Sequence, residues 1–279
     1  MRSILFLTLV CFFTALPGVA QTVLKVGRAL PTADQESRAI EYFDNGNRCR
    51  PRDFACRVAY YSKAIETYAS FAEAFNNRGS AYFIKGDTAA AVADFNKAVE
   101  LDKNFVQAFY NRAVLYTRLK DYPKAVKDFE TVVRLEPKLA YAYAGLGNVQ
   151  QEQGNYRDAI ANYSTSIVLA PGYATGHYNR ALAHSRAGDF TNAVLDFTKA
   201  IEIDPDFNMA YLGRGTARAK SGDDQNAILD LTEFIEREPG DDRGYRLRSA
   251  AYSRRGDLAR AEADKKKAER LVATLRRLK

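Results

Sequence analysis

The 279-residue sequence has few of the nitrogen and sulfur ligands that bind zinc and other transition metals, with two histidines and three cysteines. Cys11 lies in an apolar N-terminal stretch, which leaves Cys49 and Cys56 for the rest of the chain. Two thiols with no histidine nearby fall short of the four ligands of a structural zinc ion. His177 and His184 share one helix face, but they occupy packing columns of the repeat described below and lack a third ligand. We therefore expect no metal and no cofactor.

Sequence patterns of common enzymes are also missing. The chain contains no His-Glu-x-x-His, Gly-x-Ser-x-Gly or phosphate-loop pattern. No nucleophile can be paired with a base. We expect a protein that is not an enzyme and has no catalytic residues.

The chain also lacks a dense block of positive charge. The first twenty residues hold one charged residue, Arg2, and without them 40 basic residues stand against 34 acidic ones. Nucleic acids are bound by basic residues concentrated on one face, whereas this small excess is spread along the chain. The composition argues against nucleic-acid binding.

Residues 1–20 have the features of a secretory signal. Arg2 precedes an apolar stretch over residues 4–15, and small residues close the segment at 18–20. The competing interpretation, a membrane anchor, needs about 18 or more apolar residues, and this stretch is shorter. We expect cleavage before Gln21 and export, most simply to a bacterial periplasm and otherwise as a secreted protein.

A period of 34 residues, the length of two helices and two turns, runs through the rest of the chain. Three columns of similar residues keep this spacing over six units. Small residues let two helix backbones approach closely, and an aromatic ring fills the space beside them. The columns are aromatic-type (Phe75, Phe109, Tyr143, His177, Tyr211, Tyr245), tiny (Gly79, Ala113, Gly147, Ala181, Gly215, Ser249) and alanine (Ala91, Ala125, Ala159, Ala193, Ala227, Ala261).

Turn signals recur at the same spacing. A glycine, replaced once by Lys120, is predicted to end each first helix in a left-handed conformation. The Asp or Asn that follows it is predicted to cap the second helix. Proline closes the second helix at Pro137, Pro171, Pro205 and Pro239.

At these residues the sequence resembles the tetratricopeptide repeat family, and the resemblance covers nearly all of the chain after residue 20. It implies an all-α, right-handed superhelical solenoid of antiparallel helix-turn-helix units, whose first helices line a concave groove. The family's chaperone-type carboxylate clamp is not matched, because Asn76, Ser80, Tyr141 and Gly145 replace its basic and amide residues.

The period divides the chain into nine segments. These are a signal peptide (1–20), a linker (21–31), an atypical unit (32–71), five regular units (72–105, 106–139, 140–173, 174–207, 208–241) and a last unit with a capping helix (242–279). The capping helix carries an apolar stripe that is expected to cover the end of the solenoid, made of Leu258, Ala261, Ala268, Leu271, Val272, Leu275 and Leu278.

In the atypical unit, Ala39 is aligned with the tiny column and Gly46-Asn47 with the turn. This alignment requires an insertion of about six residues, Arg48–Asp53, with Cys49 near its start and Cys56 just after its end. In an oxidising compartment the two cysteines are expected to form a disulfide. The alternative is a reactive thiol at Cys56, because the first turn of a helix lowers the pKa of a thiol.

Arginine and aspartate form two further columns that are interrupted together. The third regular unit has Leu146 and Asn162 where the other units have Arg and Asp. We predict that each arginine bonds the aspartate of its own unit and so belongs to the scaffold. The columns are Arg78, Arg112, Arg180, Arg214 and Arg248, and Asp94, Asp128, Asp196, Asp230 and Asp264.

The candidate groove residues lie beside the packing columns of the first helices. An asparagine ladder can hold a peptide backbone because an amide both donates and accepts, although family background is an open alternative. Tyrosines preceding two of these residues can supply flat apolar contacts, and a basic column can attract carboxylates. The candidates are Asn77, Tyr110, Asn111, Arg118, Tyr178, Asn179, Arg186, Lys220 and Arg254, with Glu152 interrupting the basic column.

These features predict a non-catalytic scaffold or adaptor of the cell envelope that binds a protein or peptide segment in its concave groove. The alternative is an envelope structural or assembly factor that docks through its convex face or its basic C-terminal helix. Membrane contact is not predicted.

Overall fold

A computed structural model of the chain describes residues 32–277, with side chains up to residue 274. The predicted signal peptide and linker, residues 1–31, lie outside the described residues. So do the side chains of Leu275 and Leu278, which were assigned to the apolar stripe.

All regular structure between residues 32 and 277 is α-helical. The helices are α1 (Ala33–Arg48), α2 (Phe54–Thr67), α3 (Ala72–Lys85), α4 (Thr88–Leu101), α5 (Val106–Arg118), α6 (Tyr122–Leu135), α7 (Ala140–Glu152), α8 (Tyr156–Leu169), α9 (Ala174–Arg186), α10 (Phe190–Ile203), α11 (Asn208–Lys220), α12 (Asp224–Arg237), α13 (Asp242–Arg254) and α14 (Leu258–Arg277).

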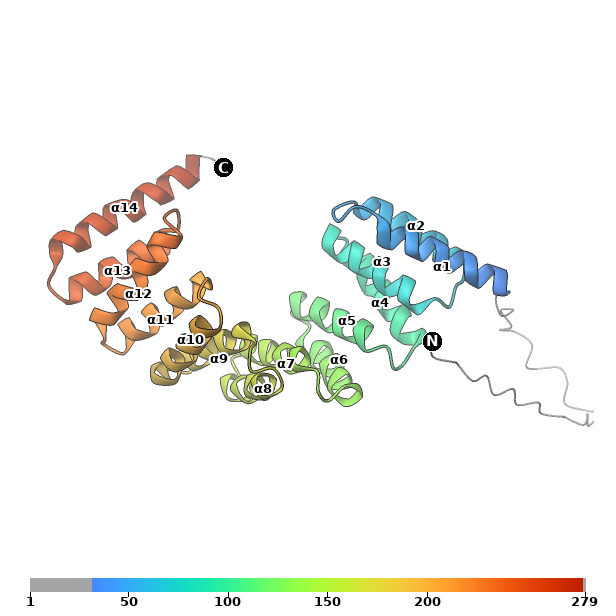
Figure 1. Cartoon of the computed structure of the whole chain (residues 1–279), viewed down its shortest axis with the longest axis horizontal. Coiled ribbons are helices and arrows are strands. Elements are labelled where there is room, and N and C mark those ends of the chain that lie inside the picture. The colour runs from blue at the N-terminus through green and yellow to red at the C-terminus, as the bar shows by residue number, and fades with distance from the viewer. Residues whose placement is uncertain (1–31, 278–279) are drawn as a thin grey trace, which may run out of the picture.

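The helices pair in chain order, and each pair packs on the next to form a solenoid (Figure 1). The array curves into an open crescent, with α7 and α8 near its middle and both ends turned to the same side. Each odd-numbered helix from α3 to α11 also contacts the next odd-numbered helix, whereas the described even-numbered helices make no comparable contacts with one another. The first helices therefore lie closest together and line the concave side. The predicted all-α solenoid of paired helices is confirmed.

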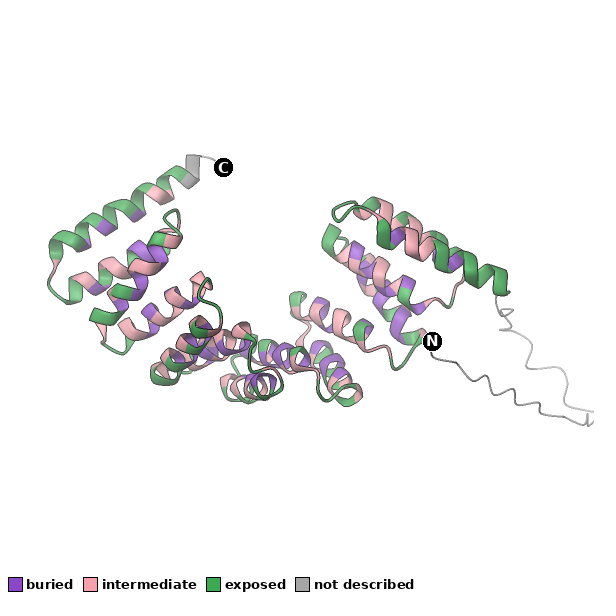
Figure 2. Cartoon of the chain, viewed as in Figure 1, coloured by how far each residue is buried: buried purple, intermediate pink, exposed green. Residues whose placement is uncertain are grey.

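The core runs between the helices along the whole array (Figure 2). The alanine column is buried in every regular unit. In four of these units an aromatic ring of the second helix packs beside the tiny column of the first, and Leu231 takes the place of the ring in the fifth. A methyl group added at Gly79 would approach the ring of Phe95 to 3.0 Å, and one at Gly147 would approach Tyr163 to 2.7 Å. The tiny residues are thus selected by close helix packing.

The turns agree in part with the prediction. Five glycines end first helices with a positive φ, and Lys120 adopts the same conformation with a φ of 59°. The Asp87, Asp189 and Asp223 side chains cap the second helices. Asp121 and Asn155 stand at the predicted N-cap positions, but the predicted side-chain caps are wrong there, since neither side chain accepts a hydrogen bond from a backbone N–H of its helix. Asp121 instead binds the Lys124 ammonium group at 2.6 Å.

The prediction that the first helix ends at Gly46-Asn47 is also wrong. Helix α1 continues to Arg48, and Gly46 is buried inside it. A methyl group at Gly46 would lie 2.6 Å from the ring of Tyr61, the same relation that Gly147 has to Tyr163. Gly46 therefore belongs to the tiny column, and α1 stops early relative to the other first helices.

The apolar stripe of α14 is narrower than predicted. Ala261 and Ala268 are buried and Leu271 packs against Ile235, but Leu258 is 69% exposed. Leu258 is the first residue of the helix.

Candidate functional site

The predicted pairs of arginine and aspartate are confirmed in all five units. In each, the guanidinium group donates two hydrogen bonds to the carboxylate sixteen residues later, as Arg78 does to Asp94 at 2.8 Å. The remaining nitrogen reaches a polar side chain of the preceding unit, here Ser62 at 3.0 Å. One arginine thus joins three helices. The equivalent partners in the other units are Asn96, Ser164, Thr198 and Thr232.

The third regular unit replaces this ionic lock with neutral contacts. Leu146 is buried, and Asn162 donates a hydrogen bond to Gln150 at 2.7 Å. Because the arginines of the other units are engaged with buried carboxylates, they belong to the scaffold and do not serve as ligand contacts.

The asparagine ladder lies on the odd-numbered helices and bridges neighbouring units. Asn111 donates from Nδ2 to Asn76 at 2.9 Å. Asn77 and Asn179 make longer bonds to the preceding first helix, at 3.4 Å and 3.5 Å. Each Nδ2 carries two hydrogens. Asn111 uses both, because it also donates to Ser80 at 3.4 Å, whereas Asn77 and Asn179 each keep one for a ligand. The ladder is therefore partly structural and partly available.

Aromatic rings fill the gaps in the ladder. At Gly213 an added methyl group would lie 2.5 Å from the ring of Phe197, and Gly145 has the same relation to Phe129. The two predicted groove tyrosines pack edge-on against these phenylalanines, with ring centroids 5.6 Å apart. The glycines are thus required by packing, which explains why asparagine is absent there.

The predicted groove tyrosines extend into larger aromatic clusters. The ring of Tyr110 lies 4.8 Å from that of Tyr141, and the ring of Tyr178 lies 4.7 Å from that of Phe207. Burial raises the pKa of both Tyr110 and Tyr178, so their hydroxyl groups stay protonated and can donate. Tyr141 is 39% exposed and presents part of its surface to solvent.

The basic column is exposed, and its members contact the preceding unit in two ways. Arg118 and Lys220 lie over the rings of Phe83 and Phe190, at 5.3 Å and 5.6 Å from the ring centroids. Arg254 binds Asp224 at 2.6 Å, and Arg186 lies 3.9 Å from Glu152. Stacking leaves a cation available for an anion, whereas an ion pair satisfies it. Arg118 and Lys220 are therefore the stronger candidates of the four.

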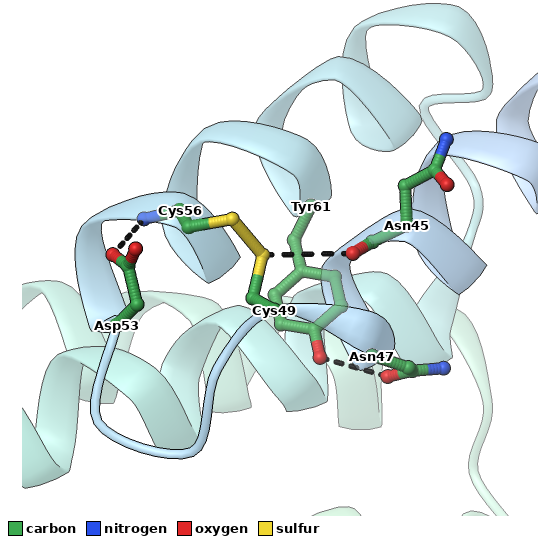
Figure 3. The surroundings of a disulfide bond; sticks show 6 residues. All are labelled: Asn45, Asn47, Cys49, Asp53, Cys56 and Tyr61. Carbon is green, nitrogen blue, oxygen red and sulfur yellow. Dashed lines mark hydrogen bonds between the residues drawn. A yellow bond between two sulfur atoms is a disulfide. The ribbon is translucent and has the colours of Figure 1, made fainter.

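The two cysteines form a disulfide in the first unit, with Cα atoms 6.0 Å apart. Figure 3 shows it joining the loop after α1 to the first turn of α2, close to Tyr61, whose hydroxyl donates to Asn47 at 2.8 Å. The carboxylate of Asp53 caps α2 through the backbone N–H of Cys56. Both thiols are consumed, so the alternative of a reactive Cys56 does not apply to this state.

Arg57 also lies at the groove, although it was not among the predicted site residues. Counting back four residues from the ring of the second helix leads from Phe95 to Ala91, and likewise from Tyr61 to Arg57. Arg57 thus occupies the alanine column, and it lines a recess of about 280 Å³ beside Asn77. The signal is present in the sequence, but it becomes visible only after Gly46 is aligned with the tiny column.

The histidines have packing roles, as predicted. His177 is buried 3.4 Å from Asp196, and His184 lies 3.1 Å from Asp189. Among the described residues, no cluster of three or more potential ligands could hold a metal ion. Within residues 32–277, no helix combines the length and hydropathy that crossing a membrane requires.

Residues 48–221 match the family model of the ETO1 C-terminal domain. The chain belongs to this family. Its fold is also shared with solved structures of tetratricopeptide repeat proteins. A tetratricopeptide repeat protein from Parabacteroides merdae is similar over 85% of this chain and 92% of its own, with 20% identity and a TM-score of 0.63.

Two further structures are similar over nearly their whole length. MamA covers 61% of this chain and 93% of its own, with 25% identity and a TM-score of 0.55. YrrB, described as a TPR protein with an unusual peptide-binding site, covers 66% of this chain and 95% of its own, with 21% identity and a TM-score of 0.54. No curated protein matches the sequence. The fold is that of a scaffold, which is typically non-catalytic.

Proposed function

We propose that this protein is a non-catalytic scaffold of the cell envelope that holds an extended segment of a partner protein in its concave groove. The observation that carries the proposal is the composition of the groove wall. Amide, aromatic and cationic side chains lie there on the first helices α5, α9 and α11, at Asn111, Arg118, Tyr178, Asn179 and Lys220.

Each of these side chains suits a different part of a polypeptide. The ladder amides can pair with backbone groups, since they both donate and accept. The half-buried tyrosines supply rigid apolar surface, which is favoured at binding hot spots. The stacked cations can attract carboxylates. YrrB, which has a similar fold, is described as having a peptide-binding site.

Export is part of the proposal. It is supported by the apolar segment at residues 4–15 and by the Cys49–Cys56 disulfide, because disulfides persist in oxidising compartments such as the periplasm. Fractionation of cells and N-terminal sequencing of the mature protein test it. A cytoplasmic protein that retains Met1 would contradict it.

Cross-linking followed by mass spectrometry on cell envelopes tests the groove. The test variant carries Asn111→Ala, Asn179→Ala and Lys220→Glu. Its matched control carries Leu195→Ala and Leu229→Ala, because these leucines are 63% and 62% exposed on second helices. The proposal predicts a partner that wild type and control capture and the groove variant loses. The same partners in all three samples would contradict it.

The alternative is a structural or assembly factor that docks through its convex face or its basic last helix. It is favoured by three exposed lysines in sequence on α14, Lys265, Lys266 and Lys267. Changing all three to glutamate should remove the captured partner if this alternative holds, and leave it in place if the groove is the binding surface.

A further inference from the structure

The early end of α1 creates a recess at the N-terminal end of the concave groove. The recess lies where the last turn of a regular first helix would otherwise pack. Its volume is about 280 Å³, and its wall includes Asn47, Arg57, Tyr61, Asn77, Ser80 and Ile84. Asn77 and Ile84 come from α3 and stand in the ladder and basic columns, so the recess opens into the groove itself.

Arg57 is the cation of this recess, and it differs from the scaffold arginines. Each scaffold arginine is locked to a buried carboxylate, as Arg78 is to Asp94. No carboxylate among residues 32–277 lies within 4.0 Å of the Arg57 guanidinium, and its buried Nε has no hydrogen-bond partner there. Arg57 therefore has no fixed anion among the described residues, and the part of its guanidinium group that lines the recess is available to an anion that enters.

The surroundings of the recess are strongly basic. The end of α1 and the loop that follows carry three more exposed arginines, Arg48, Arg50 and Arg52, and none of them pairs with a described carboxylate within 4.0 Å. The one acidic residue of the loop, Asp53, is occupied as the cap of α2. This concentration of charge attracts an anion toward the recess.

We propose that the recess binds a carboxylate group of the segment held in the groove. The inference rests on the proposed function and assigns the chemistry of one subsite. The planar fork of Arg57 matches two carboxylate oxygens, and the Nδ2 groups of Asn47 and Asn77 add donors beside it. The segment in the groove is a polypeptide, whose anionic groups are carboxylates, so phosphate is the competing probe in the test below.

The disulfide holds this subsite in place. Cys56 directly precedes Arg57, and its bond to Cys49 ties the start of α2 to the end of α1, where Asn47 lies. The donors of the recess come from both helices. Their relative position is therefore preorganised before a ligand arrives, which lowers the entropy cost of binding.

Nuclear magnetic resonance titration of the full chain tests the assignment without a known partner. The probes are acetyl-trialanine, its C-terminal amide, acetyl-Ala-Glu-Ala amide and inorganic phosphate. The readout is the arginine Nε–H resonance of Arg57, assigned by its loss in the Arg57→Lys variant. A response to acetyl-trialanine alone identifies a C-terminal carboxylate, and a response to the glutamate peptide identifies an acidic side chain.

The expected result is binding of at least one carboxylate peptide that weakens at least about tenfold in Arg57→Gln. The Arg57→Lys variant should retain part of the affinity, since it keeps the charge and loses the fork. The control is Arg134→Gln, because Arg134 is an exposed arginine of α6 without a described carboxylate partner. It should bind like wild type. Circular dichroism confirms that each variant is folded.

Three results would overturn the assignment: no response at Arg57, equal binding of the amide probe, or preferential binding of phosphate. The titration and the envelope experiment can fail separately. If the groove variant loses its partner but the Arg57 resonance responds to no carboxylate peptide, the proposed function is supported and the carboxylate subsite is wrong. If Arg57 binds a carboxylate peptide but the groove captures no partner, the carboxylate subsite is supported and the proposed function is wrong.

Discussion

The ionic lock of the scaffold allows a quantitative prediction for Arg112 and Asp128. Arg112 donates twice to Asp128 at 2.7 Å and once to Asn96 at 2.8 Å. The Asp128 side chain is 4% exposed, so Arg112→Leu leaves a buried carboxylate without its cation. Breaking one side of a buried pair costs about 3–5 kcal/mol. We expect about 3 kcal/mol, because the site is close enough to the surface for water to reach the carboxylate.

Leu146 and Asn162 in the third regular unit indicate which second substitution should restore most of the free energy of unfolding that Arg112→Leu loses. The double variant Arg112→Leu/Asp128→Asn reproduces the side chains of Leu146 and Asn162, which that unit tolerates. It removes the negative charge of Asp128 together with the arginine that balances it, so the free energy of unfolding should fall by about 1–2 kcal/mol in total. The two substitutions should therefore couple by about 2 kcal/mol in a double-mutant cycle.

Urea unfolding followed by circular dichroism measures the cycle. Amide exchange in α5 and α6 checks it locally, since repeat arrays can open unit by unit. The control cycle uses Arg38 and Asp34, whose side chains are 60% and 80% exposed and should show little coupling. If the two core substitutions simply add, the reasoning about a shared buried pair is refuted.

The disulfide, a groove glycine and a helix cap carry smaller predictions. Cys49→Ser should destabilise the first unit by about 2–3 kcal/mol on the chain-entropy model and speed amide exchange in α1 and α2, and unchanged exchange would contradict this. Gly145→Ala should cost about 1–3 kcal/mol in thermal unfolding because its methyl group meets a ring of α6. Gly172→Ala meets no atom within 4 Å, so equal losses in the two variants would refute the packing argument. Hydrogen bonds from an amide three residues later lower the pKa of Asp223 in the folded state. The stability it confers is present above its unfolded pKa of about 3.9 and is lost as pH falls through the lower folded value. Asp223→Asn should therefore flatten the acid loss of stability below about pH 4, and identical acid-melting profiles would show that the cap contributes nothing.

The sequence predicted the solenoid and its internal pairing because each depends on contacts that recur at a fixed spacing. The pairing of Arg78 with Asp94 was predictable since Leu146 and Asn162 replace both columns in the same unit. The third contact of each arginine was not predicted. It joins two units, and no pattern within one unit contains it.

The first unit was misaligned because glycine serves two purposes in this fold. It ends a helix at Gly86, with a φ of 90°, and permits close approach at Gly46. The residue type alone does not separate these roles, whereas the contact of Gly46 with Tyr61 does. With Gly46 aligned to the turn, Arg57 does not stand in the alanine column. It does so once Gly46 is aligned to the tiny column.

Site-specific photo-cross-linking in cells distinguishes a partner bound in the concave groove from one docked on the convex face. A photoreactive phenylalanine analogue replaces Tyr141, which is 39% exposed on the first helix α7, or Leu195, which is 63% exposed on the second helix α10. Binding in the groove should give adducts with a partner polypeptide from position 141 and none from position 195. Adducts from position 195 alone would contradict a groove-bound partner and favour docking on the convex face.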